Sequence, residues 1–249
     1  MTDQPVLRVD HLTKDYGRGR GAFDITLAVG RGECYGFLGP NGAGKTTTIR
    51  HLMGFSKPNK GSSAILGRDC WRDAAILKND IGYIPGEIVL PAAMTGAGFL
   101  RMMEKMRGVT DHGRTARLVE RFHLDPSVRV KKMSFGMKRK LAIVTALMHD
   151  PAVLILDEPS SGLDPMMQKE FIDCIAEEKS RGKTIFLSSH FFHEIDAACD
   201  RAAIIKEGHI VSEMDLKALK AKEGNGFDLE KYFLDFYREE AEGRTGDES

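Results

Sequence analysis

The chain has 249 residues, of which 42% are hydrophobic and 29% are charged, as in an ordinary soluble protein. Lys+Arg and Asp+Glu balance at 36 each, so no charge excess points to nucleic acid or to anionic lipid. No apolar run reaches the roughly 18–20 residues of a membrane span, and the N-terminus lacks the pattern of a secretory signal. We therefore expect a cytoplasmic chain that relies on another polypeptide for any membrane span.

The N-terminal part of the chain predicts an antiparallel β-sheet. Residues 6–9 are a strand candidate, and residues 23–29 alternate apolar and polar side chains with the period of a half-buried strand. Gly30-Arg31-Gly32 predicts a hairpin into the next apolar run, residues 34–38. Tyr16 precedes a glycine-rich turn, where its ring either stacks on a nucleotide base or packs on the strand surface.

Residues 39–46 match G-x-x-x-x-G-K-[ST], the phosphate-binding loop. The loop follows the apolar run 34–38, and residues 47–53 predict a helix, so that backbone N–H groups and the helix dipole would point at one place. Lys45 would reach the β- and γ-phosphates, and the Thr46 hydroxyl would face Mg²⁺. The alternative is a chance match in a glycine-rich chain, but the strand and helix context favours a nucleoside triphosphate site. Its loop residues are Gly39, Pro40, Asn41, Gly42, Ala43, Gly44, Lys45, Thr46 and Thr47.

The middle of the chain changes from strands to helices. Residues 62–66 and 80–84 predict short strands, and the second runs into a turn at Pro85-Gly86. Residues 92–125 predict helices, of which the segment 115–122 is amphipathic. We expect an all-helical insertion in an otherwise α/β chain.

The second half predicts a doubly wound parallel sheet. Ser134 is the expected N-cap of a helix over residues 137–148, and the continuous apolar run 152–156 is typical of a strand buried on both faces. Elements then alternate in the order that parallel sheets require. They are a helix from Pro165 to Lys179, a strand from Thr184 to Ser188, a helix ending at Ala198, and a strand pair, 201–206 and 209–213, around Glu207-Gly208.

Three side chains at predicted strand ends are candidates for the chemistry. Asp157 ends a buried strand, where a carboxylate suits the Mg²⁺ that accompanies a triphosphate. Glu158 would polarise an attacking water, unless the pair only caps the following helix. His190 follows another parallel strand and would donate to a γ-phosphate oxygen, although strand-end histidines are often structural.

The four cysteines are expected to be small buried apolar residues. Their spacing is not that of metal ligands, and a reducing compartment disfavours disulfides. They are Cys34, Cys70, Cys174 and Cys199.

Taken together, these residues resemble the nucleotide-binding domain of ATP-binding-cassette (ABC) transporters, and the resemblance covers nearly the whole chain. The phosphate loop is similar to the family's Walker A motif, and the other family motifs follow in the right order. They are Lys132-Met133-Ser134-Phe135-Gly136-Met137-Lys138 (signature), Leu154-Ile155-Leu156-Asp157-Glu158-Pro159 (Walker B), Ser161-Gly162-Leu163-Asp164 (D-loop) and Ser189-His190 (switch histidine).

The resemblance implies an ATPase that works as a pair. Two copies would bind head-to-tail around two Mg-ATP, each nucleotide contacting one Walker A motif and the partner copy's signature. Tyr16 would stack on adenine, Thr46 and Asp157 would hold Mg²⁺, and Glu158 and His190 would drive hydrolysis. The residues that would act on the second copy's nucleotide are Ser134, Phe135, Gly136 and Asp164.

Two departures from the family pattern concern the site directly. The signature keeps Ser134 and Gly136 but has Phe135 for the first glycine and Met137 for the glutamine. The Q-loop glutamine, which binds Mg²⁺ in the family, aligns with Gly86, and the adjacent Glu87 is a candidate oxygen ligand in its place.

The expected fold is α/β, with a P-loop NTPase core, an N-terminal antiparallel β-subdomain and an inserted α-helical subdomain. Residues 1–240 would form a single ABC ATPase domain. Its parts are 1–33 (antiparallel β), 34–87 and 149–213 (core), 88–148 (helical) and 214–238 (C-terminal helices), followed by a tail at 239–249 that is expected to be disordered.

The length and the C-terminal segment resemble single-cassette ATPases of bacterial exporters, which include drug and antibiotic exporters. The resemblance therefore implies a homodimer bound to an integral membrane permease at the cytoplasmic face of a bacterial membrane. It implies no nucleic acid partner, and the substrate would be set by the permease. The alternative is a non-transport ABC ATPase that acts on a cytoplasmic partner.

Overall fold

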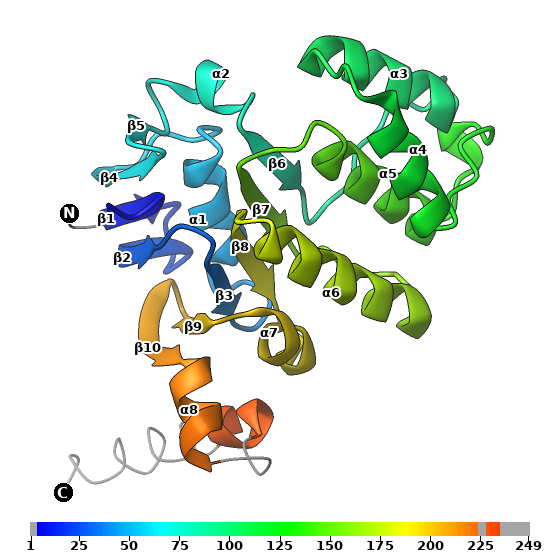
Figure 1. Ribbon diagram of the computed structural model, residues 1–249. Helices are drawn as coiled ribbons and strands as arrows, with labels where there is room; N and C mark the ends of the chain where they lie inside the picture. The colour runs from blue at the N-terminus through cyan, green and yellow to red at the C-terminus, as the bar shows by residue number, and fades with distance from the viewer. Residues whose placement is uncertain (1–3, 224–227, 235–249) are drawn as a thin grey trace, which may run out of the picture.

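The computed structural model describes residues 4–223 and 228–234, which form two β-sheets with helices packed around them (Figure 1). The strands are β1 (Leu7–Asp15), β2 (Gly21–Val29), β3 (Cys34–Leu38), β4 (Lys60–Ile65), β5 (Arg68–Asp69), β6 (Ile81–Ile84), β7 (Val153–Asp157), β8 (Thr184–Ser189), β9 (Arg201–Lys206) and β10 (His209–Asp215). The helices are α1 (Lys45–Leu52), α2 (Ala74–Leu77), α3 (Gly96–Arg107), α4 (His112–Arg121), the 3₁₀ turn η1 (Val130–Lys132), α5 (Phe135–Leu147), α6 (Pro165–Ser180), α7 (Phe192–Ala198) and α8 (Leu216–Glu223).

The larger sheet is the parallel sheet that the sequence predicts, with the strand order β10-β9-β3-β8-β7-β6. Strands β9, β3, β8, β7 and β6 are parallel, and β10 adds an antiparallel edge by pairing with β9 around Glu207-Gly208. Every residue of β3, β7 and β8 is buried, as expected of continuous apolar runs in the centre of a parallel sheet.

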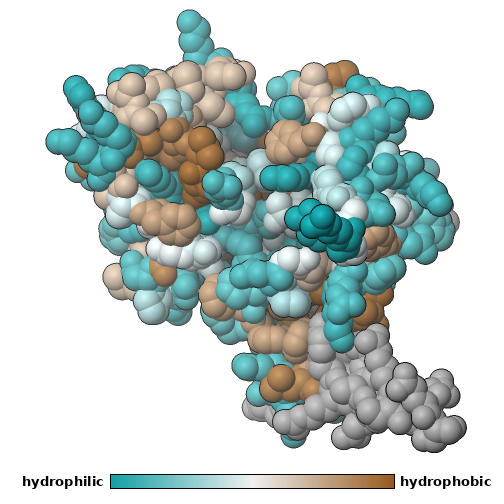
Figure 2. All heavy atoms as spheres, turned by 180° about the vertical axis from the view of Figure 1, so that it is seen from behind, coloured by the Kyte–Doolittle hydropathy of each residue, from teal (hydrophilic) through white to brown (hydrophobic). Residues whose placement is uncertain are grey.

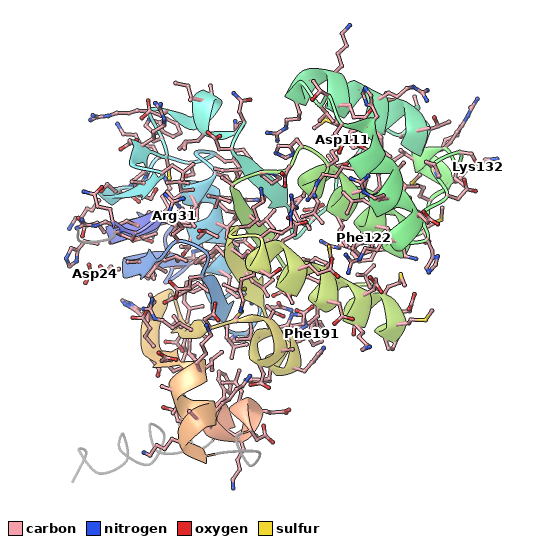
Figure 3. The ribbon with its side chains drawn as sticks, viewed as in Figure 1. Asp24, Arg31, Asp111, Phe122, Lys132 and Phe191 are labelled. Atoms are coloured by element: carbon pink, nitrogen blue, oxygen red, sulfur yellow. The ribbon has the colours of Figure 1, made fainter. Side chains whose placement is uncertain are left out.

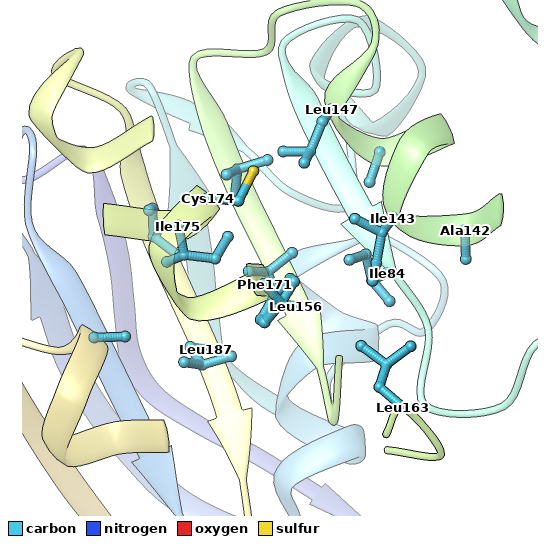
Figure 4. Close-up of a cluster of buried hydrophobic side chains, with 14 of the residues drawn as sticks. Ile84, Ala142, Ile143, Leu147, Leu156, Leu163, Phe171, Cys174, Ile175 and Leu187 are labelled. Carbon is cyan, nitrogen blue, oxygen red and sulfur yellow. The ribbon is translucent and has the colours of Figure 1, made fainter. Parts of the chain in front are cut away.

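Side chains of the central strands point alternately into two hydrophobic cores, one on each face of this sheet. On one face, Leu154 and Leu156 pack with the helices α5, α6 and α7, and Figure 4 shows Phe171 of α6 beside Leu156. On the other face, Val153 and Ile155 pack with α1 and with the apolar side of the smaller sheet.

The smaller sheet is antiparallel, with the strand order β2-β1-β4-β5, and it corrects two details of the prediction. Gly30-Arg31-Gly32 does not form a hairpin, because β2 pairs with β1 while β3 lies between β8 and β9 in the other sheet. Strand β4 pairs with β1, and β5 pairs with β4, although the prediction assigned residues 34–87 to the core. The turn at 30–32 therefore carries the chain from one sheet to the other.

Helices α3, α4 and α5 lie together at one side of the parallel sheet (Figure 1). Each begins at a side chain that accepts a hydrogen bond from the helix's first-turn N–H groups: Thr95, Asp111 and Ser134 respectively. The predicted cap at Ser134 is confirmed. Phe122, labelled in Figure 3, ends α4 fully buried, as its inward position in the amphipathic segment predicts.

The C-terminal elements are described only in part. Strand β10 extends to Asp215 and α8 follows it, while residues 229–234 are helical and bury Leu229. Residues 235–238 of the predicted helices, and the predicted tail at 239–249, lie outside the described residues. No helix in the described ranges has the length and apolar character of a membrane span.

The four cysteines are free and buried, as predicted. Cys34 and Cys199 lie close together, with their Sγ atoms 3.5 Å apart.

Candidate functional site

The site forms where the carboxyl ends of β3, β8 and β7 meet at one edge of the parallel sheet. Leu38 of β3 is in register with Ser189 of β8, and Ser188 is in register with Asp157 of β7. The segments that leave these strands are the phosphate loop, the turn with His190 and the turn with Glu158. The parallel register therefore brings together the three predicted groups that are far apart in the sequence.

The phosphate loop depends on glycine at positions that no other residue fits. A Cβ on Gly39 would lie 2.3 Å from the Ile205 carbonyl oxygen, and Gly44 has φ +108° directly before α1. Gly42 also has a positive φ, +82°. The loop thus delivers the free N–H groups of the α1 N-terminus, which form an anion site together with the ammonium group of Lys45. That group lies buried under the loop and donates to the backbone oxygens of Gly39 and Pro40.

A hollow of about 320 Å³ opens beside the loop. Tyr16, Arg20 and Glu158 line it together with residues of the loop. Tyr16 is 46% exposed, and the Lys14 ammonium lies over its ring, 5.6 Å from the ring centre. Arg20 was not predicted, since nothing in the sequence distinguishes it from the other basic residues of its turn.

Thr46 and Asp157 form an oxygen pair that fits a hard divalent cation. The Thr46 hydroxyl donates to Asp157 Oδ2 over 2.9 Å, and the Ser188 hydroxyl donates to Oδ1 over 2.6 Å. Asp157 is fully buried, so these contacts fix its carboxylate in one orientation. A hydroxyl and a carboxylate at the mouth of a phosphate loop are ligands that suit Mg²⁺. The sequence did not single out Ser188, because its strand ends in two consecutive serines, Ser188 and Ser189.

Glu158 is held between a cation and an imidazole. Its Oε1 lies 3.1 Å from the Lys45 ammonium, and its Oε2 lies 2.6 Å from Nδ1 of His190. Its backbone has φ +48°, a left-handed value that non-glycine residues rarely adopt. The alternative role for this pair, capping the next helix, does not apply, because Asp164 caps α6.

Gly86, where the sequence departs from the Q-loop of the family, lies against the carboxylate of Asp157. A Cβ on Gly86 would be 3.1 Å from Asp157 Oδ2, so the turn passes directly over this carboxylate. Glu87 is exposed, and within the described ranges no hydrogen bond or ion pair joins it to Thr46 or Asp157. Its predicted role as a metal ligand stays a prediction.

The signature residues form a second surface at the start of α5. Ser134 accepts from the Met137 N–H over 3.2 Å, and Phe135 is 53% exposed, with its ring over Gly162. Among the residues that the structure describes, no hydrogen bond or ion pair links Ser134, Phe135, Gly136 or Asp164 to the phosphate loop of the same chain. Ser134 and Phe135 are both exposed at this surface.

Arg139 joins the two surfaces, and no pattern in the sequence distinguishes it. It is fully buried, and its guanidinium donates to the backbone oxygens of Ser161, Pro85 and Gly86 over 3.1, 2.9 and 2.9 Å. Burial lowers its pKa, while the carboxylates of the site act in the opposite direction. In the sequence Arg139 is one of three consecutive basic residues, which are typical of an exposed helix face.

Comparison with known proteins places the chain among ATP-binding subunits of transporters. A family model described as "ABC transporter" matches residues 22–161. The chain is 35% identical to the Nod factor export ATP-binding protein I of Paraburkholderia xenovorans, over 88% of this chain and 74% of that protein. It is 37% identical to the bacitracin transport ATP-binding protein BcrA of Bacillus licheniformis, over 87% of this chain and 72% of that protein. A solved structure of the ATP-binding subunit of an ABC transporter superposes with a TM-score of 0.82 at 30% identity, covering 92% of this chain and 98% of the other.

We predict that Arg139→Met lowers the free energy of unfolding by about 3 kcal/mol or more. Three partly buried carbonyl oxygens lose their donor, and each buried polar group left unpaired costs roughly 1–3 kcal/mol. Urea denaturation followed by circular dichroism measures the change. Lys138→Met is the control, since it removes the neighbouring charge without touching these bonds and is expected to stay within about 0.5 kcal/mol of the original chain. Equal stability of the two variants would contradict the role of Arg139.

Proposed function

This chain belongs to the ABC transporter family as an ATP-binding ATPase subunit, and on that premise we propose that it drives export through a separate membrane permease. The observation that carries the proposal is the position of Glu158, between Lys45 and His190 at the mouth of the phosphate loop. A carboxylate held there faces the place where the terminal phosphate of ATP would lie.

The proposed roles follow from these contacts. Lys45 and the N–H groups of residues 42–47 bind the β- and γ-phosphates, and Tyr16 stacks on the adenine. Glu158 accepts a proton from the water that attacks the γ-phosphorus, as the bond to the β–γ bridging oxygen breaks. His190 holds the Glu158 carboxylate and donates to the γ-phosphate. Thr46 and Asp157 would hold Mg²⁺, which neutralises phosphate charge when bound.

The second half of the site is proposed to come from another copy of the chain. Ser134 and the N–H groups near Gly136 start a helix, which is a second anion site, and they are not joined to the phosphate loop of their own chain. In a head-to-tail dimer, Ser134, Phe135, Gly136 and Asp164 would each face the partner copy's ATP. Two nucleotides would then hold the dimer together, and hydrolysis would release it.

The membrane partner is proposed from the relatives. Two of them are named for the export of Nod factor and the transport of bacitracin, which are activities of those proteins. We infer that this chain likewise binds an integral membrane permease, at the cytoplasmic face of a bacterial membrane. Seen from behind (Figure 2), the mainly hydrophilic surface carries apolar side chains gathered at the upper left, a feature consistent with protein contacts.

We predict that Glu158→Gln binds ATP, hydrolyses it at least about 10²-fold more slowly, and accumulates as a dimer. The amide still fills the position but accepts a proton poorly. Turnover is measured by phosphate release, and the dimer by light scattering in saturating Mg-ATP. A protein that stays monomeric under these conditions would contradict the shared site.

The signature provides a matched test of the same dimer. In the Glu158→Gln background, Ser134→Ala is expected to abolish ATP-dependent dimerisation. Thr95→Ala is the control, because it also removes a helix N-cap but lies at α3. Both variants lose about 1 kcal/mol of capping energy, so a difference in dimerisation between them isolates the contact with ATP.

The candidate metal ligand Glu87 is tested by titrating Mg²⁺ in the ATPase assay. If Glu87 binds the ion directly or through water, Glu87→Ala raises the half-saturating Mg²⁺ concentration several-fold. Glu120→Ala, which removes an exposed carboxylate from α4, is the control and leaves it unchanged. An unchanged Mg²⁺ dependence in Glu87→Ala would remove Glu87 from the metal site.

The permease itself can be captured. Tagged full-length chain, purified from membranes of its own bacterium, is expected to retain an integral membrane protein that mass spectrometry identifies. Recovery of a soluble partner alone, with no membrane protein, would favour a non-transport ABC ATPase.

A further inference from the structure

Glu194 is a buried carboxyl group for which the proposed mechanism has no role. It lies in the first turn of α7 and is 1% exposed. Burial raises its pKa, and the nearby Glu158 carboxylate raises it further, while His193 and the hydroxyls of Ser160 and Ser189 act in the opposite direction. A carboxyl group is rarely kept in such a place unless its contacts are needed.

The contacts of Glu194 fix the backbone on both sides of His190. The Ser189 hydroxyl donates to Glu194 Oε2 over 2.5 Å, and the Phe191 N–H donates to the same hydroxyl over 2.9 Å. Ser189 and Phe191 are the two neighbours of His190 in the chain. Figure 3 labels Phe191 at the start of α7, and its ring centre lies 4.0 Å from that of His190.

The turn of Glu158 also lies near Glu194. Ser160, two residues after Glu158, is 1% exposed, and its hydroxyl acts to lower the pKa of Glu194. Ser160 Oγ and Glu194 Oε1 are both buried, and neither has a hydrogen-bond partner among the residues described. The loop that carries Ser160 is tied to Glu158 itself, since the Ser161 N–H donates to the Glu158 carbonyl oxygen over 3.2 Å.

We propose that Glu194 is a positioning residue that holds the turn of His190 in the place where its side chain meets Glu158. The inference rests on the proposed roles of Glu158 and His190. Their contact, Nδ1 to Oε2 over 2.6 Å, joins two turns that leave different strands, and the His190 side chain is 35% exposed. Through Ser189, Glu194 is bonded to the chain on both sides of His190. Displacement of a catalytic group by about 1 Å costs roughly 10²-fold in rate.

A purely structural role makes a different prediction. If Glu194 only stabilised α7, its loss would lower the thermal stability and the ATP affinity together. If it positions His190, its loss lowers kcat while KM for ATP stays almost unchanged, because Glu194 does not touch the phosphate loop or the hollow beside it.

The experiment compares Glu194→Ala with Glu194→Gln in the full-length chain, with mant-ATP affinity, kcat, KM and Tm as readouts. Glu194→Ala is expected to lose about 10- to 100-fold in kcat, with KM and mant-ATP affinity within about twofold. Glu194→Gln is expected to retain at least half of kcat, since its amide oxygen still accepts from the Ser189 hydroxyl. Glu104→Ala, which removes a buried carboxylate that contacts His112 on the helical side, is the matched control and keeps its kcat.

Ser189→Ala provides an independent test of the proposal if Glu194→Ala fails to fold. It removes the hydroxyl that links Glu194 to Phe191, so it is expected to lower kcat by a similar factor, and the double variant is expected to be no slower than either single one. Additive losses would contradict a shared role.

The proposal is overturned if Glu194→Ala keeps its kcat, if kcat falls only together with ATP affinity, or if folded Glu194→Gln is as slow as Glu194→Ala. The unmutated chain and Glu158→Gln are assayed for ATP hydrolysis in parallel. If Glu158→Gln hydrolyses ATP as fast as the unmutated chain, the proposed catalytic role of Glu158 fails. A normal loss in Glu158→Gln with no loss in Glu194→Ala overturns the role of Glu194 alone.

Discussion

Three buried parallel strands, β3, β7 and β8, run side by side in a register that brings their carboxyl ends to one edge of the sheet. The site depends on this pairing. Each strand delivers one component there, namely the phosphate loop, the Asp157–Glu158 pair and His190. The strands can be buried on both faces because two hydrophobic cores cover them, one formed with α5, α6 and α7 and the other with α1 and the antiparallel sheet. A rigid scaffold of this kind holds charged groups in place while the loops that carry them stay at the surface.

Electrostatics then decide how these groups are arranged. Glu158 is placed between the Lys45 ammonium and His190, and Asp157 receives two hydroxyl donors, so the two neighbouring carboxylates face different partners. Glu158 adopts a positive φ of +48°, a backbone conformation that non-glycine residues rarely have and that is concentrated at functional sites.

Buried polar side chains link the turns of the site to one another. Arg139 ties the Pro85–Gly86 turn and the loop after Glu158 to α5, and Glu194 braces the turn of His190 through Ser189. The helix that carries the exposed signature surface is therefore connected to the turn that passes over Asp157.

The sequence by itself determined the elements whose signals are local. The strand–loop–helix of residues 34–53, the Ser134 cap and the apolar run ending at Asp157 each follow from side-chain pattern, capping chemistry or glycine at positive φ. Only the tertiary structure decided which strands pair, because pairing joins residues far apart in the chain. Strands β4 and β5 belong to the antiparallel sheet, and residues 30–32 connect the two sheets where the sequence predicted a hairpin. It also decided the places of Arg139, Glu194 and Glu87. Burial of a charged side chain depends on the segments packed around it, and no local pattern distinguishes a buried Arg139 from the lysines beside it.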